Sequence, residues 1–478
     1  MLLIILLCVP FAASVLSWLV KKRTLVLESL AAGASTIELA AALSLAGSVA
    51  KSGPYSLTDS FSVDPLGAVV ILILAIIGVV AAWYSAGYLR AEVEKSIIGF
   101  HRVRQYFVLL HLFIFAMFFA VATTSPTLMW IAIEATTLST AFLISFYNNA
   151  SATEAAWKYL LVNSVGLLLG FFGTLLFLSP AESAGLTDWN SLFAAAAGFD
   201  PFIAKIAFVF VFIGYGTKVG WVPMHTWRPD AYSKAPIPVV ALFSGSLLSV
   251  AFLAVLRFKL IADASLGGDF SANMLIGFGL SSIVVAAFSM LGQKNYKRLL
   301  AYSSIKHAGI IALGFGFGGA AAGAALLHLI YHALAKSALF LSAGNIFLKY
   351  SSTKVENVRG VLSALPVTGV LFLAGFVAII GLPPFGLFFT ELSILAAGIQ
   401  YHPAVSVIVL LALALGFIGF LRHAVAMMFG EREKRIAPGE AGVWTIVPII
   451  ILLAILAAAS WYLPVSFRSL LESAVLAY

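Results

Sequence analysis

The segment GYGTKVGWVPMHTWRPD, which runs from Gly214 to Asp230, carries a lysine within an apolar part of the chain. Because the apolar run begins near Phe202, Lys218 is predicted to lie inside a membrane. A lysine there costs about 2.5–3.5 kcal/mol on insertion scales, and such residues usually serve ion or proton transfer. Pro223 interrupts the helix, and a broken membrane helix must satisfy its freed backbone groups with protein or water. We therefore expect an ion or proton pathway beside Lys218; a proline kink with a lysine that reaches the interface is the alternative.

A carboxylate, Glu134, lies well inside another apolar segment, LMWIAIEATTLSTAF. At that depth a carboxylate is either protonated or paired with a cation. Lys218 is the expected partner if the fifth and seventh predicted helices touch. Each partner would change the affinity of the other for a proton, so such a pair could act as a proton switch. A purely structural buried ion pair is the alternative.

The second half of the chain supplies further ionisable groups. His307 occurs in KRLLAYSSIKHAG, and His328, His332 and Lys336 are spaced i, i+4, i+8 in LLHLIYHALAKSALF, which places these three on one helical face. Two histidines at this spacing could bind a metal, but no third ligand of the usual type adjoins them in the sequence. A hydrated proton relay fits better, because imidazole carries protons near neutral pH and Glu391 could continue the line. Hydrogen bonding of the histidines to a kinked backbone is the alternative.

Lys158 is a further candidate for proton transfer. It lies near the predicted start of a helix in EAAWKYLLVNSVG, where its side chain could also extend its charge to the membrane interface. Asp230, beside the first helix break, is expected to cap or pin the loop.

The composition requires elements that cross a membrane. Hydrophobic residues make up 62% of the chain, charged residues only 10%, and the mean hydropathy is +1.05. At roughly 30 residues per helix and loop, the chain has room for about 14 spans and no sizeable soluble domain. The net charge of +8 is interpreted as an orientation signal and gives no reason to expect nucleic acid. The single cysteine, Cys8, excludes an iron–sulfur cluster or a disulfide framework within this chain.

Hydropathy predicts an all-α membrane protein. The predicted spans are 1–20, 25–50, 65–89, 104–122, 125–147, 155–178, 201–222 with a broken extension, 236–261, 273–292, 300–318, 320–348, 364–399 with a break, 403–429 and 442–463. Breaks in the seventh and twelfth helices predict two inverted five-helix repeats, approximately 104–261 and 273–429, with a site in each. No linker divides residues 1–478, so we expect a single proton-translocating domain.

Charges in the loops predict the orientation of the chain. Basic residues such as Lys21–Arg23, Lys297 and Arg298 fall in alternate connections, and Arg228 is assigned to the same side. Acidic residues dominate the opposite loops. This asymmetry predicts a multi-pass protein of the inner (cytoplasmic) membrane with both termini away from the cytoplasm.

Five motifs resemble those of the antiporter-like subunits of respiratory complex I: WIAIEATTLSTAFL, GYGTKVGWVPMHTWRPDA, KRLLAYSSIKHAG, HLIYHALAKSALF and GLPPFGLFFTELSIL. The same superfamily includes the large subunits of multisubunit cation/proton antiporters and the membrane subunits of energy-converting hydrogenases. The resemblance covers most of the chain. IEATTLSTAFL and GYGTK are most similar to the group 4 [NiFe] hydrogenase branch found in formate hydrogenlyase-type complexes.

The resemblance implies roles for the residues above. Glu134 and Lys218 match the charged residues of the fifth and broken seventh helices, and Glu391 matches the lysine or glutamate of the broken twelfth. The polar line of the second half is matched by His307, His328, His332 and Lys336. The family implies an axis of buried charge that couples redox work in a peripheral arm to proton pumping. Iron–sulfur clusters, nickel–iron or quinone would belong to partners, since this chain has neither an active site nor a cofactor site of its own.

The sequence departs from the family pattern in the eighth helix. Many relatives carry a lysine or histidine where FSGSLLSVAFLAVLRF has Ser249, which can hold water but no charge. Tyr232 and Asn295 likewise replace a histidine and an aspartate. We expect water and serines, Ser249 among them, to carry protons between the halves. The alternatives are a sodium/proton antiporter subunit, a subunit of an inorganic-carbon uptake complex, and a scaffold that has lost transport.

Overall fold

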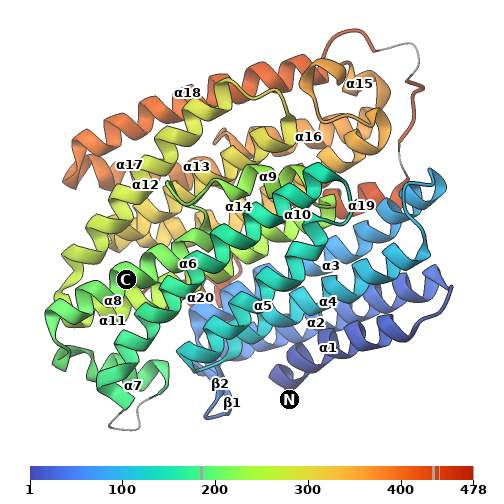
Figure 1. Cartoon of the computed structure of the whole chain (residues 1–478). Helices are drawn as coiled ribbons and strands as arrows, with labels where there is room; N and C mark the ends of the chain where they lie inside the picture. Colours follow the sequence, from blue (N-terminus) through green and yellow to red (C-terminus); the bar gives the residue numbers. More distant parts are fainter. Residues whose placement is uncertain (183–186, 433–435, 441, 477–478) are drawn as a thin grey trace.

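The computed structural model describes residues 1–182, 187–432, 436–440 and 442–476. The described chain forms one elongated bundle of long helices that run side by side (Figure 1). The amino-terminal helices are α1 (Leu2–Leu19), α2 (Thr24–Ser52), α3 (Pro65–Glu94) and α4 (Phe100–Ala122). The middle of the chain forms α5 (Pro126–Ile144), α6 (Ala150–Glu182), α7 (Trp189–Ala195), α8 (Pro201–Val219), α9 (Trp227–Lys234), α10 (Ile237–Leu242), the π-helical turn η2 (Phe243–Leu247) and α11 (Leu248–Leu266). The remainder forms α12 (Gly268–Leu291), α13 (Tyr296–Phe317), α14 (Gly319–Tyr350), α15 (Val361–Ala364), α16 (Pro366–Ile379), α17 (Gly386–Tyr401), α18 (Pro403–Met428), α19 (Val443–Trp461) and α20 (Val465–Val475).

The predicted all-α membrane fold is confirmed. Thirteen helical segments of the described part are long and apolar enough to cross a membrane, and α10, η2 and α11 form one of them. The predicted twelfth span, 364–399 with a break, corresponds to two helices, α16 and α17, of which α16 is a shorter apolar helix. The inverted relation of the two repeats and the single-domain organisation remain predictions.

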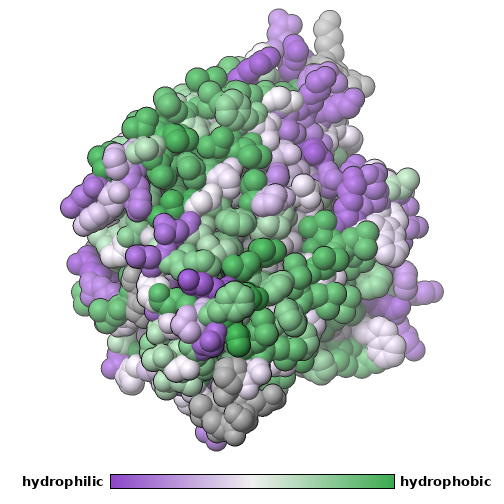
Figure 2. Space-filling model, turned by 60° about the vertical axis from the view of Figure 1, so that its left-hand side comes forward, coloured by the Kyte–Doolittle hydropathy of each residue, from purple (hydrophilic) through white to green (hydrophobic). Residues whose placement is uncertain are grey.

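The central helices are buried by their neighbours, whereas the outer helices expose apolar side chains. Every residue in the most apolar window of Ile237–Leu266 is buried. In the corresponding windows of α13 and α14, 94% of the residues are buried. In contrast, only a third of the corresponding windows of α1, α18 and α19 is buried. Figure 2 shows hydrophobic residues across the middle of the molecular surface and hydrophilic residues gathered toward its edges. The interior thus lies between α10–α11, α13 and α14, and the apolar exterior suits lipid.

The first predicted helix break is confirmed between α8 and α9. The backbone N–H of Val222 donates to Oγ of Ser282 on α12, at 3.0 Å. The indole N–H of Trp227 donates to the carbonyl of Thr217, at 2.9 Å. These bonds satisfy backbone groups that the break removes from the helix, so an interruption at membrane depth is tolerated.

The second predicted break lies between α16 and α17. Here the backbone N–H of Gly386, the first residue of α17, donates to Oγ of Ser460 on α19, at 2.8 Å. Gly381 within the break has a φ of 71°, a conformation that glycine adopts without a steric penalty. A neighbouring helix again satisfies the interrupted backbone.

Short elements outside the spans were not predicted. Strands β1 (Tyr55–Thr58) and β2 (Phe61–Val63) form an antiparallel hairpin in which Tyr55 pairs with Val63. The hairpin and α7 lie at the same end of the bundle (Figure 1). These elements have three to seven residues each, too few to form a long apolar run.

Candidate functional site

The first cluster of polar groups surrounds Lys218 on the last turn of α8. Its side chain is fully buried. The Nζ atom donates to Oγ1 of Thr137 on α5 and to the hydroxyl of Tyr159 on α6, each at 2.8 Å. The same atom lies 5.0 Å from the centre of the Tyr159 ring. Three helices therefore hold the ammonium, and both of its hydrogen-bond acceptors among the described residues are hydroxyl groups.

Glu134 is joined to Lys218 through Thr137. The Thr137 hydroxyl donates to Oε2 of Glu134, at 3.2 Å, and accepts from Lys218. The other carboxylate oxygen accepts from Oγ of Ser164 on α6, at 2.9 Å. The predicted direct ion pair is therefore corrected: among the described residues, the two charges are bridged. The reason is local, because positions i and i+3 are neighbours on a helix surface and Thr137 occupies the place nearest to Lys218.

The bridging hydroxyl yields a direct prediction. Replacement of Thr137 by alanine is expected to lower proton transport about tenfold, because a buried hydrogen bond to a charged group contributes about 1.5–3 kcal/mol. Replacement by serine, which keeps the hydroxyl, is expected to retain most of the transport. Proton uptake by vesicles that contain the assembled complex measures both. Equal rates for the alanine and serine variants would show that the hydroxyl has no part in transfer.

The second cluster joins α13, α14 and α17. Nδ1 of His307 lies 2.9 Å from Nε2 of His328 and 3.7 Å from Oε1 of Glu391. Nδ1 of His328 lies 2.8 Å from Oγ1 of Thr390. The rings of His307 and His332 are 5.4 Å apart, between their centres. Four residues that the sequence predicted to act together are therefore neighbours in the fold.

Three residues of this cluster could hold a metal ion. One donor atom each from His307, His328 and Glu391 lies within 4.8 Å of the others. Spacing along the sequence could not find this set, because its ligands come from three helices. Lys306 and Lys336 both act electrostatically on His307, and two cations nearby oppose a doubly charged ion. The arrangement therefore suits proton transfer better than metal binding.

Lys336 lies two turns beyond His328 on α14 and is fully buried. Its Nζ atom donates to the carbonyl of Leu300 on α13, at 2.9 Å. Between the two lies His332, neither of whose ring nitrogens has a hydrogen-bond partner among the described residues. Buried polar atoms are normally paired with protein or water. Ordered water beside His332 would complete a line from Lys336 to His328.

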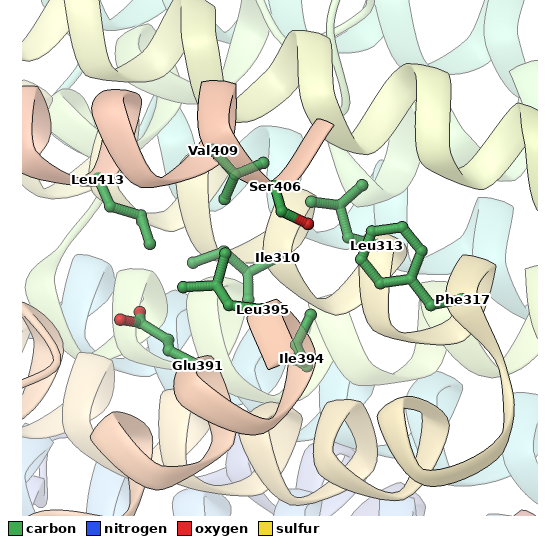
Figure 3. A pocket seen from close by; sticks show the side chains of 9 residues that line it. All are labelled: Ile310, Leu313, Phe317, Glu391, Ile394, Leu395, Ser406, Val409 and Leu413. Atoms are coloured by element: carbon green, nitrogen blue, oxygen red, sulfur yellow. The ribbon is translucent and has the colours of Figure 1, made fainter. Parts of the chain in front are cut away.

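Glu391 borders a small cavity between α13, α17 and α18 (Figure 3). The other lining residues include Ile310, Leu313 and Phe317 of α13 and Ser406 of α18. Its volume, about 10 Å³, is close to the least that holds one water molecule. The carboxylate itself is 8% exposed, so Glu391 lies at the edge of the buried cluster.

The carboxylate of Glu391 also packs against the backbone of Gly381 in the second break. A Cβ atom at Gly381 would collide with the carboxylate, and the positive φ costs other residues about 1–2 kcal/mol. Gly381→Ala is therefore expected to lower the thermal stability of the complex and to reduce proton transport, because the carboxylate of Glu391 must move away from the added methyl group. Gly323→Ala on α14, where an added Cβ meets nothing within 4 Å, is the matched control. Normal transport by Gly381→Ala would contradict the tight packing.

Lys158 and Ser249 lie outside both clusters. The Lys158 side chain is 51% exposed and forms ion pairs with Glu154, at 2.6 Å, and Asp230, at 3.3 Å. Asp230 also pairs with Arg298 of α13, so it pins α6, α9 and α13 together, as predicted. Ser249 donates to the carbonyl of Gly245 on its own helix, at 2.8 Å. A role for Lys158 or Ser249 in proton transfer stays a prediction.

The sequence analysis missed several residues of the site. Thr137, Tyr159 and Thr390 contact the predicted charges, but hydroxyl residues are common in membrane helices and carry no signal by themselves. Arg228, which is expected in a charged loop, lies on the helix α9, and its side chain is 1% exposed. The side of the membrane on which it lies stays a prediction. The proline that breaks α8 returns the chain into the bundle, which hydropathy alone cannot detect.

Comparisons with known proteins agree with this fold. A protein-family profile described as NADH:quinone oxidoreductase/Mrp antiporter, TM, matches residues 123–418. The chain is 37% identical over 384 residues to a hydrogenase-4 component F homolog of Methylacidiphilum infernorum, covering 79% of this chain and 81% of that protein. Its fold is similar to that of a chain in an archaeal membrane-bound sulfane sulfur reductase, with a TM-score of 0.87, 23% identity and coverage of 100% and 96%. It is also similar to a chain of respiratory complex I from Thermus thermophilus, with a TM-score of 0.77, 25% identity and coverage of 96% and 97%.

Proposed function

Because the chain belongs to the NADH:quinone oxidoreductase/Mrp antiporter membrane family, we propose that it is the proton-translocating membrane subunit of a redox-driven complex. The observation that carries the proposal is the pair of buried charged clusters, one beside each helix break. Ionisable groups at membrane depth are costly and usually functional. Lys218 and the cluster around Lys336 and Glu391 meet that description.

The chemistry of the proposed transfer follows from the contacts. The hydroxyl of Thr137 can pass a proton between Glu134 and Lys218, because it donates to one and accepts from the other. In the second half, His307 and His328 share a hydrogen bond close to Glu391. Nδ1 of His307 faces both Nε2 of His328 and Oε1 of Glu391, so a proton on this nitrogen can pass either to the neighbouring imidazole or to the carboxylate.

The surface around Glu134 favours a neighbouring membrane subunit. Glu134 is only partly buried within this chain, and Ile131, Leu138 and Phe142 on the same helix are exposed. A carboxylate among apolar side chains at membrane depth requires a polar partner or a proton. A second membrane subunit against α5 would cover this face, and changes in that subunit would reach Lys218 through Thr137.

We propose that electron transfer takes place in partner subunits. The similar proteins are named as parts of hydrogenase, sulfur reductase and complex I assemblies. Iron–sulfur clusters, with nickel–iron or quinone, would therefore belong to a peripheral redox arm. We further propose that the chain is a multi-pass protein of the cytoplasmic membrane with both termini away from the cytoplasm.

Purification of the native complex in mild detergent, followed by mass spectrometry, tests the proposal. Co-purification of a nickel–iron large subunit or other iron–sulfur proteins is the expected result. Recovery of small membrane subunits alone would contradict a redox-driven complex and favour a cation/proton antiporter. The family description, which includes Mrp antiporters, supports that second function. A requirement for sodium separates the two.

A further inference from the structure

Arg228 on α9 is a buried cation that the proposed transfer does not use. Its guanidinium lies near the rings of Trp227 and Tyr232, with Cζ 5.8 and 5.6 Å from the ring centres. Nε and Nη1 have no hydrogen-bond partner among the described residues, and no described carboxylate forms an ion pair with Arg228. A buried, unpaired charge strongly destabilises a fold, whereas attraction by aromatic rings offsets only a part of this cost. Packing alone therefore does not explain an arginine here.

Arg228 lies between the first helix break, next to Lys218, and the second charged cluster. Its side chain packs on Gly220, which ends α8 two residues after Lys218, and a Cβ atom on Gly220 would lie 2.8 Å from Cδ of Arg228. Toward α14, the Tyr232 ring near the guanidinium contacts Phe340, with ring centres 5.6 Å apart, and Nζ of Lys336 lies 6.0 Å from the centre of the Phe340 ring. The guanidinium is thus held by the segment that carries Lys218, and two aromatic rings connect it to Lys336 in the second cluster.

A pair of hydroxyl groups, one from η2 and one from α13, connects the two halves of the chain. Oγ of Ser244 in η2 lies 2.9 Å from Oγ of Ser304 on α13. Ser304 lies one helical turn beyond Leu300, whose carbonyl accepts from Lys336. The hydroxyl of Ser249 is occupied by the carbonyl of Gly245. The eighth helix therefore offers polar contact to the second cluster but no charge.

We propose that Arg228 is a positioning residue whose fixed positive charge couples the first break to the second cluster, in place of the ionisable side chain that Ser249 does not supply. This role rests on the proposed function. Arginine does not release its proton in proteins, so Arg228 acts through its field. The field opposes a second positive charge on Lys336 and His332, which helps a proton that reaches them to move on toward Glu391. A shift of α8 when Lys218 gains or loses a proton would move Gly220 and, with it, Arg228.

The coupling role is tested with charged and neutral replacements in the native complex. Arg228→Lys keeps the charge, Arg228→Met keeps much of the volume without it, and Lys205→Met removes an exposed positive charge from α8 as a control. The readout is the number of protons taken up by inside-out membrane vesicles per donor oxidised. We expect Arg228→Lys to retain at least about half of the wild-type ratio and Lys205→Met to match wild type. Arg228→Met should lose about tenfold, within the usual range of coupling between sites.

The outcomes separate charge from shape. If Arg228→Met pumps as well as Arg228→Lys, or if both variants assemble and fail equally, the proposal is overturned. Should Arg228→Met fail to assemble, Arg228→Gln takes its place with the same expectations. If neither neutral variant assembles while Arg228→Lys does, Arg228 has a structural role and the proposal also fails. Measurement of Lys218→Met in the same assay distinguishes failure of the proposed function from failure of the coupling role. Normal pumping by Lys218→Met refutes the proposed function. If Lys218→Met fails to pump while Arg228→Met pumps normally, only the coupling role is refuted.

Discussion

Replacement of Lys218 by methionine is expected to reduce proton pumping about 100-fold while the complex still assembles. Methionine fills a similar volume but cannot carry a proton, so the hydroxyls of Thr137 and Tyr159 would lose the only ammonium that they contact among the described residues. The proton path from Glu134 to the other ionisable groups would then be interrupted. Proton uptake by inside-out membrane vesicles, energised in turn with hydrogen, formate and NADH, measures the effect.

Lys205 provides the matched control for this prediction. It lies on the same helix, but its side chain is exposed, with Nζ 5.9 Å from the centre of the Phe270 ring. Lys205→Met therefore removes one positive charge from α8 without changing the buried cluster, and we expect normal pumping. Equal losses in the two variants would mean that the net charge of α8, and not the buried lysine, determines transport.

Replacement of Glu391 by glutamine is expected to have an effect of similar size. Glutamine has nearly the same shape as glutamate but cannot take up a proton, so Nδ1 of His307 would lose the carboxylate that can accept a proton from it. We expect pumping to fall about 100-fold, since this group exchanges protons directly. The same vesicle assay measures the loss, and mass spectrometry of the purified complex checks assembly.

An exposed glutamate controls for the loss of negative charge. Glu356 pairs only with Lys354 in the described structure, at 3.6 Å, and its side chain is 66% exposed. Glu356→Gln should leave pumping unchanged. Wild-type pumping by Glu391→Gln would show that the carboxylate is not part of the pathway and that the relay ends at His307 and His328.

The fold was predictable because long apolar segments indicate the spans and prolines indicate the helix breaks. Long apolar runs determined the spans, and Pro223 and Pro383–Pro384 marked both interruptions, which the structure places between α8 and α9 and between α16 and α17. The hairpin at Tyr55–Val63 and the short helix α7 escaped prediction. Such elements depend on local hydrogen bonds and on packing against the ends of the bundle, and neither leaves an apolar pattern.

The candidate site was predictable in its charges but not in its contacts. A carboxylate or lysine inside an apolar run is rare enough to be noticed, so Glu134, Lys218, Lys336 and Glu391 stood out. The bridge through Thr137 depends on which residue of α5 faces α8, and helix packing decides that. Arg228 was assigned to the wrong environment because its neighbours in the sequence are polar, although the fold returns them to the interior.

The most direct test of the central claim is the number of protons moved per pair of electrons by the purified complex, reconstituted in liposomes without sodium. We predict proton movement that begins with addition of the electron donor, persists without sodium and is lost in Lys218→Met. Proton movement that requires sodium, or that needs no electron donor, would contradict a redox-driven proton pump.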